Sequence, residues 1–110
     1  NPNLLLVDDD RGLLRLLTIR LEGEGYGVTA VVHGQSARDK LQNDSFDVVL
    51  SDLRMPGLDG LSLFEEIMGI RKDIPVILMT AHGTIADAVA ATQRGVFGFL
   101  CRYEATYGSV

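Results

Sequence analysis

The chain has little of three things: cysteine, long apolar runs and positive charge. A single cysteine among 110 residues excludes an internal disulfide, which is consistent with a reducing compartment. A helix that crosses a bilayer needs about 20 consecutive apolar residues, and no stretch of this sequence approaches that length. No basic and apolar leader is found at the start. The sequence therefore predicts a cytoplasmic domain without a membrane partner, which can be one part of a longer protein.

Positive charge is outnumbered, since Lys and Arg total 10, Asp and Glu total 15, and the formal net charge is −5. This balance argues against a surface that binds nucleic acid or an anionic membrane. The chain contains no G-x-x-x-x-G-K followed by Ser or Thr, and its glycines at 23–27 lack the G-x-G-x-x-G spacing. His33 and His82 lack the spacing of metal ligands. These absences weigh against a P-loop, a dinucleotide site and a histidine metal site.

The residues that are present suit a globular protein with a core. Hydrophobic residues make up 46% and charged residues 23%, and 110 residues suffice for one domain, 1–110. Short apolar runs alternate with helical periodicity, which is typical of βαβ units and a parallel sheet. The expected strands cover about 3–8, 28–32, 46–51, 74–79 and 96–101. The expected helices lie between Asp10, as N-cap, and Gly23, and over 36–42, 61–68 and 84–94, with Gly69 ending the third.

This alternating pattern stops before it is complete. Only Tyr103 to Val110 follow the last expected strand, and these residues are too few for the helix of about 10–14 residues that the pattern requires. The sequence thus predicts an α/β domain whose final helix is short or missing, truncated or altered after about residue 102.

Four of the apolar runs end in reactive polar groups. These groups are the acids Asp8, Asp9 and Asp10, the acid Asp52, the hydroxyl of Thr80 and the cation Arg102. The carboxyl ends of parallel strands share one edge of a sheet, and open α/β sheets bind their ligands there. We therefore expect these groups to converge.

Asp52 is the strongest candidate for chemistry. A carboxylate at the end of a strand can attack phosphorus and form an acyl phosphate. Phosphoryl transfer needs alignment and charge neutralisation, and Mg²⁺ supplies the latter while bound to one or two carboxylates, water and phosphate. Asp9 and Asp52 are candidate direct ligands, and Asp8 can act directly or through water. The carbonyl of Arg54, in the loop after Asp52, can complete the shell.

Each of these residues also has a simpler interpretation. Acids such as those at 8–10 begin helices, where they offset the helix dipole, although three acids exceed what a cap requires. Thr80 can donate to a phosphoryl oxygen or simply lead into the next helix. Arg102 can bring positive charge to the same group or be a solvated surface residue. The functional interpretation is favoured because the acids, Asp52 and Thr80 all follow strands in the same way.

Three segments, taken together, resemble the receiver domain of bacterial two-component response regulators. They are Leu-Val-Asp-Asp-Asp at 6–10, Ser-Asp-Leu-Arg-Met-Pro-Gly-Leu-Asp-Gly at 51–60 and Met-Thr-Ala-His-Gly at 79–83, and the similarity covers about 3–102. The stretch 80–100 resembles receivers attached to NtrC-type activators of sigma-54 RNA polymerase. The resemblance implies a three-layer flavodoxin-like (CheY-like) fold, a doubly wound parallel sheet of five strands in the order 2-1-3-4-5.

The resemblance also implies a function. Asp52 would accept the phosphoryl group of a phosphohistidine on a sensor histidine kinase. Mg²⁺ or Mn²⁺ would be held by Asp8, Asp9, Asp52 and the backbone carbonyl of Arg54. The phosphoryl group would be contacted by Thr80, Ala81 and Arg102, and Phe99 would be the aromatic switch that follows Thr80. Such a domain is not an enzyme beyond its own phosphotransfer and slow dephosphorylation.

The implied output is a population shift in the face formed by the helix at 84–94 and the strand at 96–101. That shift would control dimerisation and thereby transcription, without direct contact between this domain and nucleic acid. The implied partners are the kinase and a second copy of the chain, bound through that face or through the flank left uncovered by the missing helix.

Two features depart from the family. Where the family has Lys-Pro after the last strand, this chain has Arg102-Tyr103. Arginine keeps the charge but is longer and planar, and without proline a cis peptide bond that aims the cation is lost, so phosphorylation or relay is expected to be weaker. The missing helix would expose apolar sheet surface. We hypothesise that 103–110 is foreign or altered sequence, or that another chain covers the flank.

Two alternative functions stay open. A degenerate receiver would bind a partner without phosphorylation; the pair Arg102-Tyr103 favours this function, and the intact set of acids argues against it. A small aspartyl-phosphate phosphatase would also use a strand-end Asp and Mg²⁺. That class usually has a second acid two residues beyond the nucleophile, where this chain has Arg54, and a cap domain for which this chain has no room.

Overall fold

The computed structural model describes residues 1–80 and 85–101, which form a parallel sheet and the helices that cover it. The strands are β1 (Asn3–Val7), β2 (Gly27–Val31), β3 (Val48–Asp52), β4 (Val76–Thr80) and β5 (Gly98–Cys101). The helices are α1 (Arg11–Gly23), α2 (Gly34–Asn43), α3 (Gly60–Ile70) and α4 (Ile85–Gln93). The five strands pair in the order β2-β1-β3-β4-β5, all parallel, which confirms the predicted fold.

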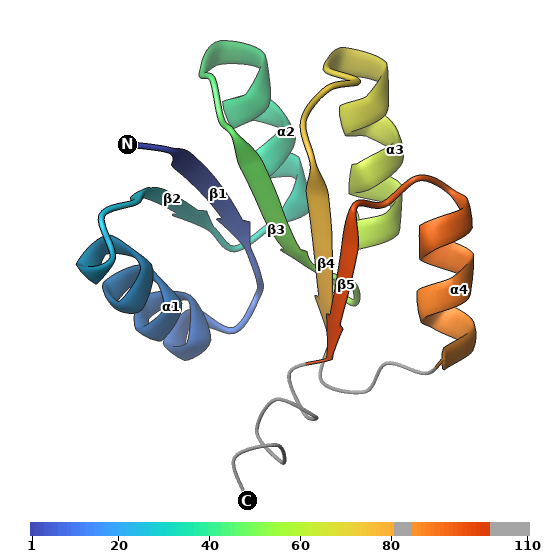
Figure 1. Ribbon diagram of the computed structural model, residues 1–110, viewed down its shortest axis with the longest axis horizontal. Coiled ribbons are helices and arrows are strands. Elements are labelled where there is room, and N and C mark those ends of the chain that lie inside the picture. The colour runs from blue at the N-terminus through green and yellow to red at the C-terminus, as the bar shows by residue number, and fades with distance from the viewer. Residues whose placement is uncertain (81–84, 102–110) are drawn as a thin grey trace, which may run out of the picture.

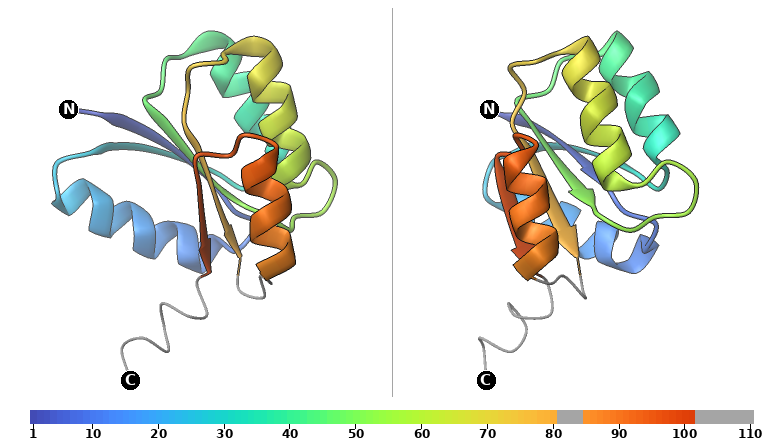
Figure 2. Two further views of the ribbon diagram at one scale, coloured as in Figure 1. Left: turned by 45° about the vertical axis from the view of Figure 1, so that its right-hand side comes forward. Right: turned by 90° about the vertical axis from the view of Figure 1, so that its right-hand side faces the viewer.

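The helices lie on both faces of the sheet (Figure 1). α1 lies on one face, whereas α2, α3 and α4 lie on the other, as Figure 2 shows. β1 pairs with both β2 and β3, so the chain winds outward from β1 in two directions. The switch point of the sheet therefore lies at the carboxyl ends of β1 and β3, where folds of this kind bind ligands. None of the described helices is both long and apolar enough to span a membrane.

The main core lies between the sheet and the helices α2, α3 and α4. Leu5 and Val7 of β1 are 0% exposed and belong to this core, as does Leu63 of α3. Side chains alternate along a strand, so Leu4 and Leu6 point to the opposite face, where both are buried as well. Burial of one such side chain contributes about 1.5–3 kcal/mol. Because β1 is packed on both faces, the position of the residues that follow it is fixed.

Part of the sheet face that carries α1 is open among the described residues. Strand register places Leu50, Ile77, Met79 and Leu100 on this face. Met79 is buried and Leu50 and Ile77 are half-buried, but Leu100 is 52% exposed. Figures 1 and 2 show no described helix over β4 and β5 on this side. The segment 102–110, and with it the predictions made for the tail, lies outside the described residues.

Three strands begin later than the sequence predicts. The apolar residues Phe46, Ile74 and Val96 were expected to start them, but the strands begin at Val48, Val76 and Gly98. All three apolar residues are buried in the main core from the preceding loops. Hydrophobicity therefore indicated burial correctly, whereas strand pairing starts only where the backbone reaches its neighbour.

Helix boundaries also differ from the prediction. The sequence predicts that Gly69 ends α3, but the helix continues to Ile70, and the N–H of Arg71 donates to the carbonyl oxygen of Ile67 (2.6 Å). The prediction was wrong because one glycine weakens a helix by only about 1 kcal/mol, and the buried side chains of α3 outweigh that penalty. α2 begins at Gly34, before the predicted range 36–42.

Aspartates cap the two helices that follow the site-bearing strands. Asp10 accepts a hydrogen bond from the N–H of Leu13 (3.1 Å), which confirms the predicted cap of α1. Asp59 accepts one from the N–H of Ser62 (2.9 Å) at the start of α3. Each cap satisfies an amide that the helix leaves without an internal partner.

We expect Asp59→Ala to lower the free energy of unfolding by about 1 kcal/mol, because a helix N-cap is lost. Urea denaturation measures this change. Asp59→Asn is the matched control, since asparagine retains a side-chain acceptor, and its loss should be a small fraction of that value. Equal losses in the two variants would show that the charge of Asp59, and not its capping bond, stabilises α3.

Candidate functional site

The carboxyl ends of β1 and β3 bring three acids together. Asp8 and Asp9 follow β1, and Asp52 is the last residue of β3; each offers a carboxylate oxygen, and these oxygens all lie within 4.8 Å of one another. Asp8 is 0% exposed and Asp52 is 5% exposed, whereas Asp9 is exposed. The cluster is therefore set into the edge of the sheet and is open to solvent on the side of Asp9.

Backbone amides orient two of these carboxylates. The N–H of Asp10 donates to Oδ1 of Asp8 (2.9 Å), and the N–H of Arg54 donates to Oδ1 of Asp52 (3.3 Å). Hydrogen bonds to an ionised group are stronger than neutral ones. They compensate part of the negative charge and hold each carboxylate in a defined direction at the end of its strand.

The donor set fits a hard divalent cation. Three carboxylates at this separation repel one another, and a cation between them relieves that repulsion. Mg²⁺ prefers oxygen ligands and is usually bound by one or two carboxylates with water and phosphate, and Mn²⁺ accepts the same ligands. The cluster consists of acids alone. Asp8, Asp9 and Asp52 can therefore hold such an ion, and the carbonyl of Arg54 follows them in the adjoining loop.

Two glycines allow the loop after Asp52 to pack closely against its neighbours. A Cβ atom on Gly60 would overlap the carbonyl oxygen of Asp52, and one on Gly34 would overlap the carbonyl oxygen of Leu58. The N–H of Gly60 also donates to the carbonyl oxygen of Leu53 (3.0 Å). The end of the loop, at Leu58 to Gly60, is thus held both against β3 and against the first turn of α2.

Thr80 and Phe99 lie on the strands next to β3. Thr80 is the last residue of β4 and is 2% exposed. The register pairs Asp52 with Met79, so Thr80 lies one residue beyond the neighbour of Asp52. Phe99 is half-buried and packs against the main core. Their roles in phosphoryl binding and switching stay predictions. Ala81, His82 and Arg102 lie outside the described residues.

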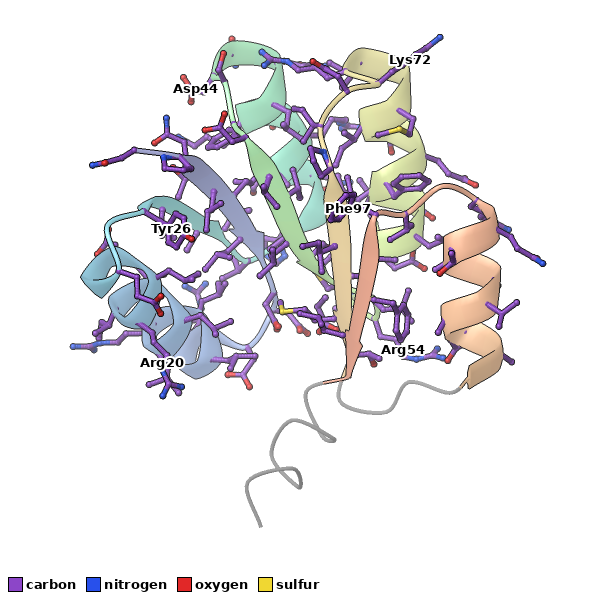
Figure 3. All side chains as sticks on the ribbon, viewed as in Figure 1. Arg20, Tyr26, Asp44, Arg54, Lys72 and Phe97 are labelled. Carbon is purple, nitrogen blue, oxygen red and sulfur yellow. The ribbon has the colours of Figure 1, made fainter. Side chains whose placement is uncertain are left out.

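The structure also contains a contact that the sequence does not predict. The guanidinium Nη2 of Arg54 lies 3.4 Å from Oδ2 of Asp87, in the first turn of α4. Figure 3 shows Arg54 between the carboxyl ends of the strands and α4. The two residues are 33 positions apart, and no local pattern connects them. An acid in a first helical turn indicates only a favourable interaction with the helix dipole.

The fold and the site together define a class of protein. The chain is a doubly wound α/β domain with an acid pocket at the switch point of its sheet, where such folds bind ligands. Residues 4–104 match the response regulator receiver domain. The chain therefore belongs to that family and is a receiver domain of two-component response regulators.

Proteins named as transcriptional regulators are similar in sequence to this chain. Over 100 residues the chain is 53% identical to the transcriptional regulatory protein GlrR of Escherichia coli (strain K12), which covers 91% of this chain and 22% of GlrR. The DNA-binding transcriptional regulator NtrC of Klebsiella pneumoniae is 42% identical over 95 residues, 86% of this chain and 20% of NtrC. The predicted resemblance to NtrC-type receivers is confirmed. The chain spans about a fifth of the length of these curated relatives.

A solved structure with the same fold is that of the response regulator protein TrrA from Thermotoga maritima in complex with Mg²⁺-BeF. Its TM-score is 0.83 and its sequence identity is 29%, over 92% of this chain and 86% of that chain. The CheY-like architecture predicted for the chain is thus shared with a receiver-type protein of known structure.

Proposed function

We propose that this domain is a phosphoacceptor in which Asp52 takes a phosphoryl group from a sensor histidine kinase in an Mg²⁺-dependent reaction. The observation that carries the proposal is the cluster of Asp8, Asp9 and Asp52, whose carboxylate oxygens lie within 4.8 Å of one another at the switch point of the sheet. Membership of the receiver family supports it, as does the Mg²⁺-BeF complex of the similar protein TrrA.

Within this proposal the three acids have different roles. Asp8 and Asp9 hold Mg²⁺ or Mn²⁺ together with Asp52 and the carbonyl of Arg54, and the ion, when bound, neutralises charge on the transferred phosphoryl oxygens. A carboxylate oxygen of Asp52 attacks phosphorus. The new O–P bond forms as the N–P bond of the phosphohistidine breaks, and the histidine nitrogen keeps the electron pair. The N–H of Arg54, which donates to Oδ1 of Asp52, orients the attacking carboxylate.

The remaining predicted residues serve the phosphorylated state. Thr80 and Ala81 contact the phosphoryl oxygens, and Arg102 supplies positive charge to them. Phe99 changes its burial as Thr80 moves, which shifts the population of conformations in the face formed by α4 and β5. This shift controls the pairing of two copies, through that face or through the apolar flank at Leu100, which is 52% exposed. It thereby regulates a transcriptional output elsewhere in a longer cytoplasmic protein, and this domain neither touches nucleic acid nor acts as an enzyme beyond its own phosphotransfer.

Incubation with acetyl phosphate and MgCl₂, followed by intact mass spectrometry, tests the proposal. We expect one phosphoryl adduct in the unsubstituted protein and none in Asp52→Asn, because the amide cannot attack phosphorus. Asp73→Asn removes an exposed acid near the opposite edge of the sheet and should keep the adduct. EDTA should suppress adduct formation in every case. An adduct that persists in Asp52→Asn would refute the assignment of Asp52.

The same assay separates the alternative functions. A phosphatase would release inorganic phosphate catalytically and accumulate no adduct. A degenerate receiver would form no adduct at all, and the pair Arg102-Tyr103, in place of Lys-Pro, is the observation that favours it. We expect slow adduct formation, because arginine keeps the positive charge but directs it differently.

A further inference from the structure

α4 has few apolar anchors among the described residues. Of its side chains from Ala86 to Gln93, only that of Ala91 is buried, and Val89 is 49% exposed. Apolar burial is the main source of helix placement in a folded domain. The polar contacts of α4 therefore contribute a larger share of its attachment than they would in a well-packed helix.

Among the described residues, two ion pairs attach α4 to the rest of the molecule, one near each end. In its first turn Asp87 pairs with Arg54 of the loop after β3 (3.4 Å). Directly after its last turn Arg94 pairs with Glu65 of α3 (2.6 Å). The two pairs differ in one respect: Arg94 is attached to a helix of the core, whereas Arg54 is attached to the acid cluster.

Arg54 contacts the cluster and α4 with different parts of the same residue. Its N–H donates to Oδ1 of Asp52 (3.3 Å), and its guanidinium lies against Asp87. Figure 3 shows the residue where the loop, the strand ends and α4 meet. A change in the backbone at this position moves the base of the side chain that reaches α4.

We propose that Arg54 is a positioning residue whose side chain couples the state of the Asp52 site to the first turn of α4. A cation held by the acids fixes the carboxylate of Asp52 and, with it, the backbone of Arg54. The side chain then has fewer conformations to lose when it pairs with Asp87, so the pair is favoured and α4 is held more firmly. The link to a bound cation rests on the proposed function, whereas the attachment itself does not.

The size of the effect follows from the exposure of the pair. The side chain of Arg54 is 66% exposed and that of Asp87 is 30% exposed, and pairs of this kind change an equilibrium by roughly two- to fivefold. Coupling between two equilibria is reciprocal. Loss of the pair must therefore weaken Mg²⁺ binding by the same factor by which Mg²⁺ strengthens the pair.

Amide hydrogen exchange in the metal-free protein tests the attachment. Arg54→Ala should speed the exchange of α4 amides by roughly two- to fivefold, and Arg54→Lys by less, because lysine keeps the charge. Asp87 has a further interaction, so Asp87 is substituted only in a charge exchange. Arg54→Asp combined with Asp87→Arg should recover most of the protection that Arg54→Asp alone removes. Unchanged exchange in Arg54→Ala would overturn the attachment.

Exchange in the presence of Mg²⁺, with calorimetry as the measure of binding, tests the coupling. Mg²⁺ should slow α4 exchange in the unsubstituted protein and have no effect on α4 in Arg54→Ala. Arg94→Ala is the matched control, which should loosen the end of α4 but retain the response to Mg²⁺. Mg²⁺ binding with an equal α4 response in Arg54→Ala would overturn the coupling alone. Absence of Mg²⁺ binding would overturn the proposed function as well, and the metal-free result would still decide the attachment.

Discussion

Asp9→Asn is expected to lower the affinity for Mg²⁺ by about ten- to a hundredfold. Asp9 is the exposed member of the acid cluster, and its carboxylate oxygen lies within 4.8 Å of those of Asp8 and Asp52. The substitution removes one negative charge from the proposed metal site, where Coulomb energies of about 1–4 kcal/mol per pair of unit charges apply at partly exposed positions. Titration calorimetry in metal-free buffer measures the change.

The same substitution should raise the free energy of unfolding of the metal-free protein by about 0.5–1 kcal/mol, because one of three mutually repelling carboxylates is removed. Addition of Mg²⁺ should reverse the ranking, because a ligand that binds only the folded state stabilises it by an amount that rises with the logarithm of its affinity. Urea denaturation measures both effects. Asp9→Asn should be the more stable protein in EDTA, and the unsubstituted protein should be the more stable one in MgCl₂.

Asp10→Asn is the matched control for this experiment. It removes one negative charge from the next residue, but asparagine is as good an N-cap as aspartate, so the bond from the N–H of Leu13 can be kept. Asp10 is not part of the cluster. If Asp10→Asn weakened Mg²⁺ binding as much as Asp9→Asn does, the effect would come from the general negative field of the segment, and the assignment of Asp9 as a ligand would be wrong.

Gly60→Ala is expected to lower the free energy of unfolding by about 1–3 kcal/mol, the range for overpacked sites. An added Cβ would overlap the carbonyl oxygen of Asp52, and that atom belongs to the backbone of a buried strand, so it cannot rotate away. The loop must move instead, and the N–H of Arg54 that donates to Asp52 moves with it. Thermal or urea denaturation measures the loss.

Gly69→Ala, in the same helix, should have the opposite effect. Nothing lies within 4 Å of the position where its Cβ would be, and alanine is preferred to glycine inside a helix by about 0.5–1 kcal/mol. The two variants thus make the same chemical change at two positions of α3, and we expect opposite changes in the free energy of unfolding. If both glycines tolerated alanine equally, the close approach of the loop to β3 would not be required for stability.

The convergence of the acids at one edge of the sheet could be predicted from the alternating pattern, and the resemblance to receiver domains implied the strand order that makes β1 and β3 neighbours. Asp8 and Asp52 end apolar runs of the parallel strands that neighbour each other at the switch point, and the alternation of runs and helical stretches was sufficient to place them at one edge. The exact ends of the strands were harder to predict. Phe46, Ile74 and Val96 extend the apolar runs, but in the folded chain they are buried in the loops that precede the strands.

Other features depend on distances between segments that no local pattern records. The ion pair of Arg54 with Asp87 joins positions 33 residues apart, and the need for glycine at position 34 arises from the backbone of the loop that carries Leu58. At Gly69 the prediction was wrong because glycine often ends helices. Here nothing lies close to this glycine, and the buried side chains of α3 keep the helix going to Ile70. The roles of such residues depend on their contacts in the folded chain.

The close approach at Gly34 has a consequence for motion. Most elements of a domain touch through side chains, which can change rotamer and absorb a small displacement. Here the carbonyl oxygen of Leu58 occupies the space of a missing methyl group on α2, so the main chain of the loop lies directly against the main chain of α2. We therefore expect a shift of the segment that follows Asp52 to displace the start of α2 as well.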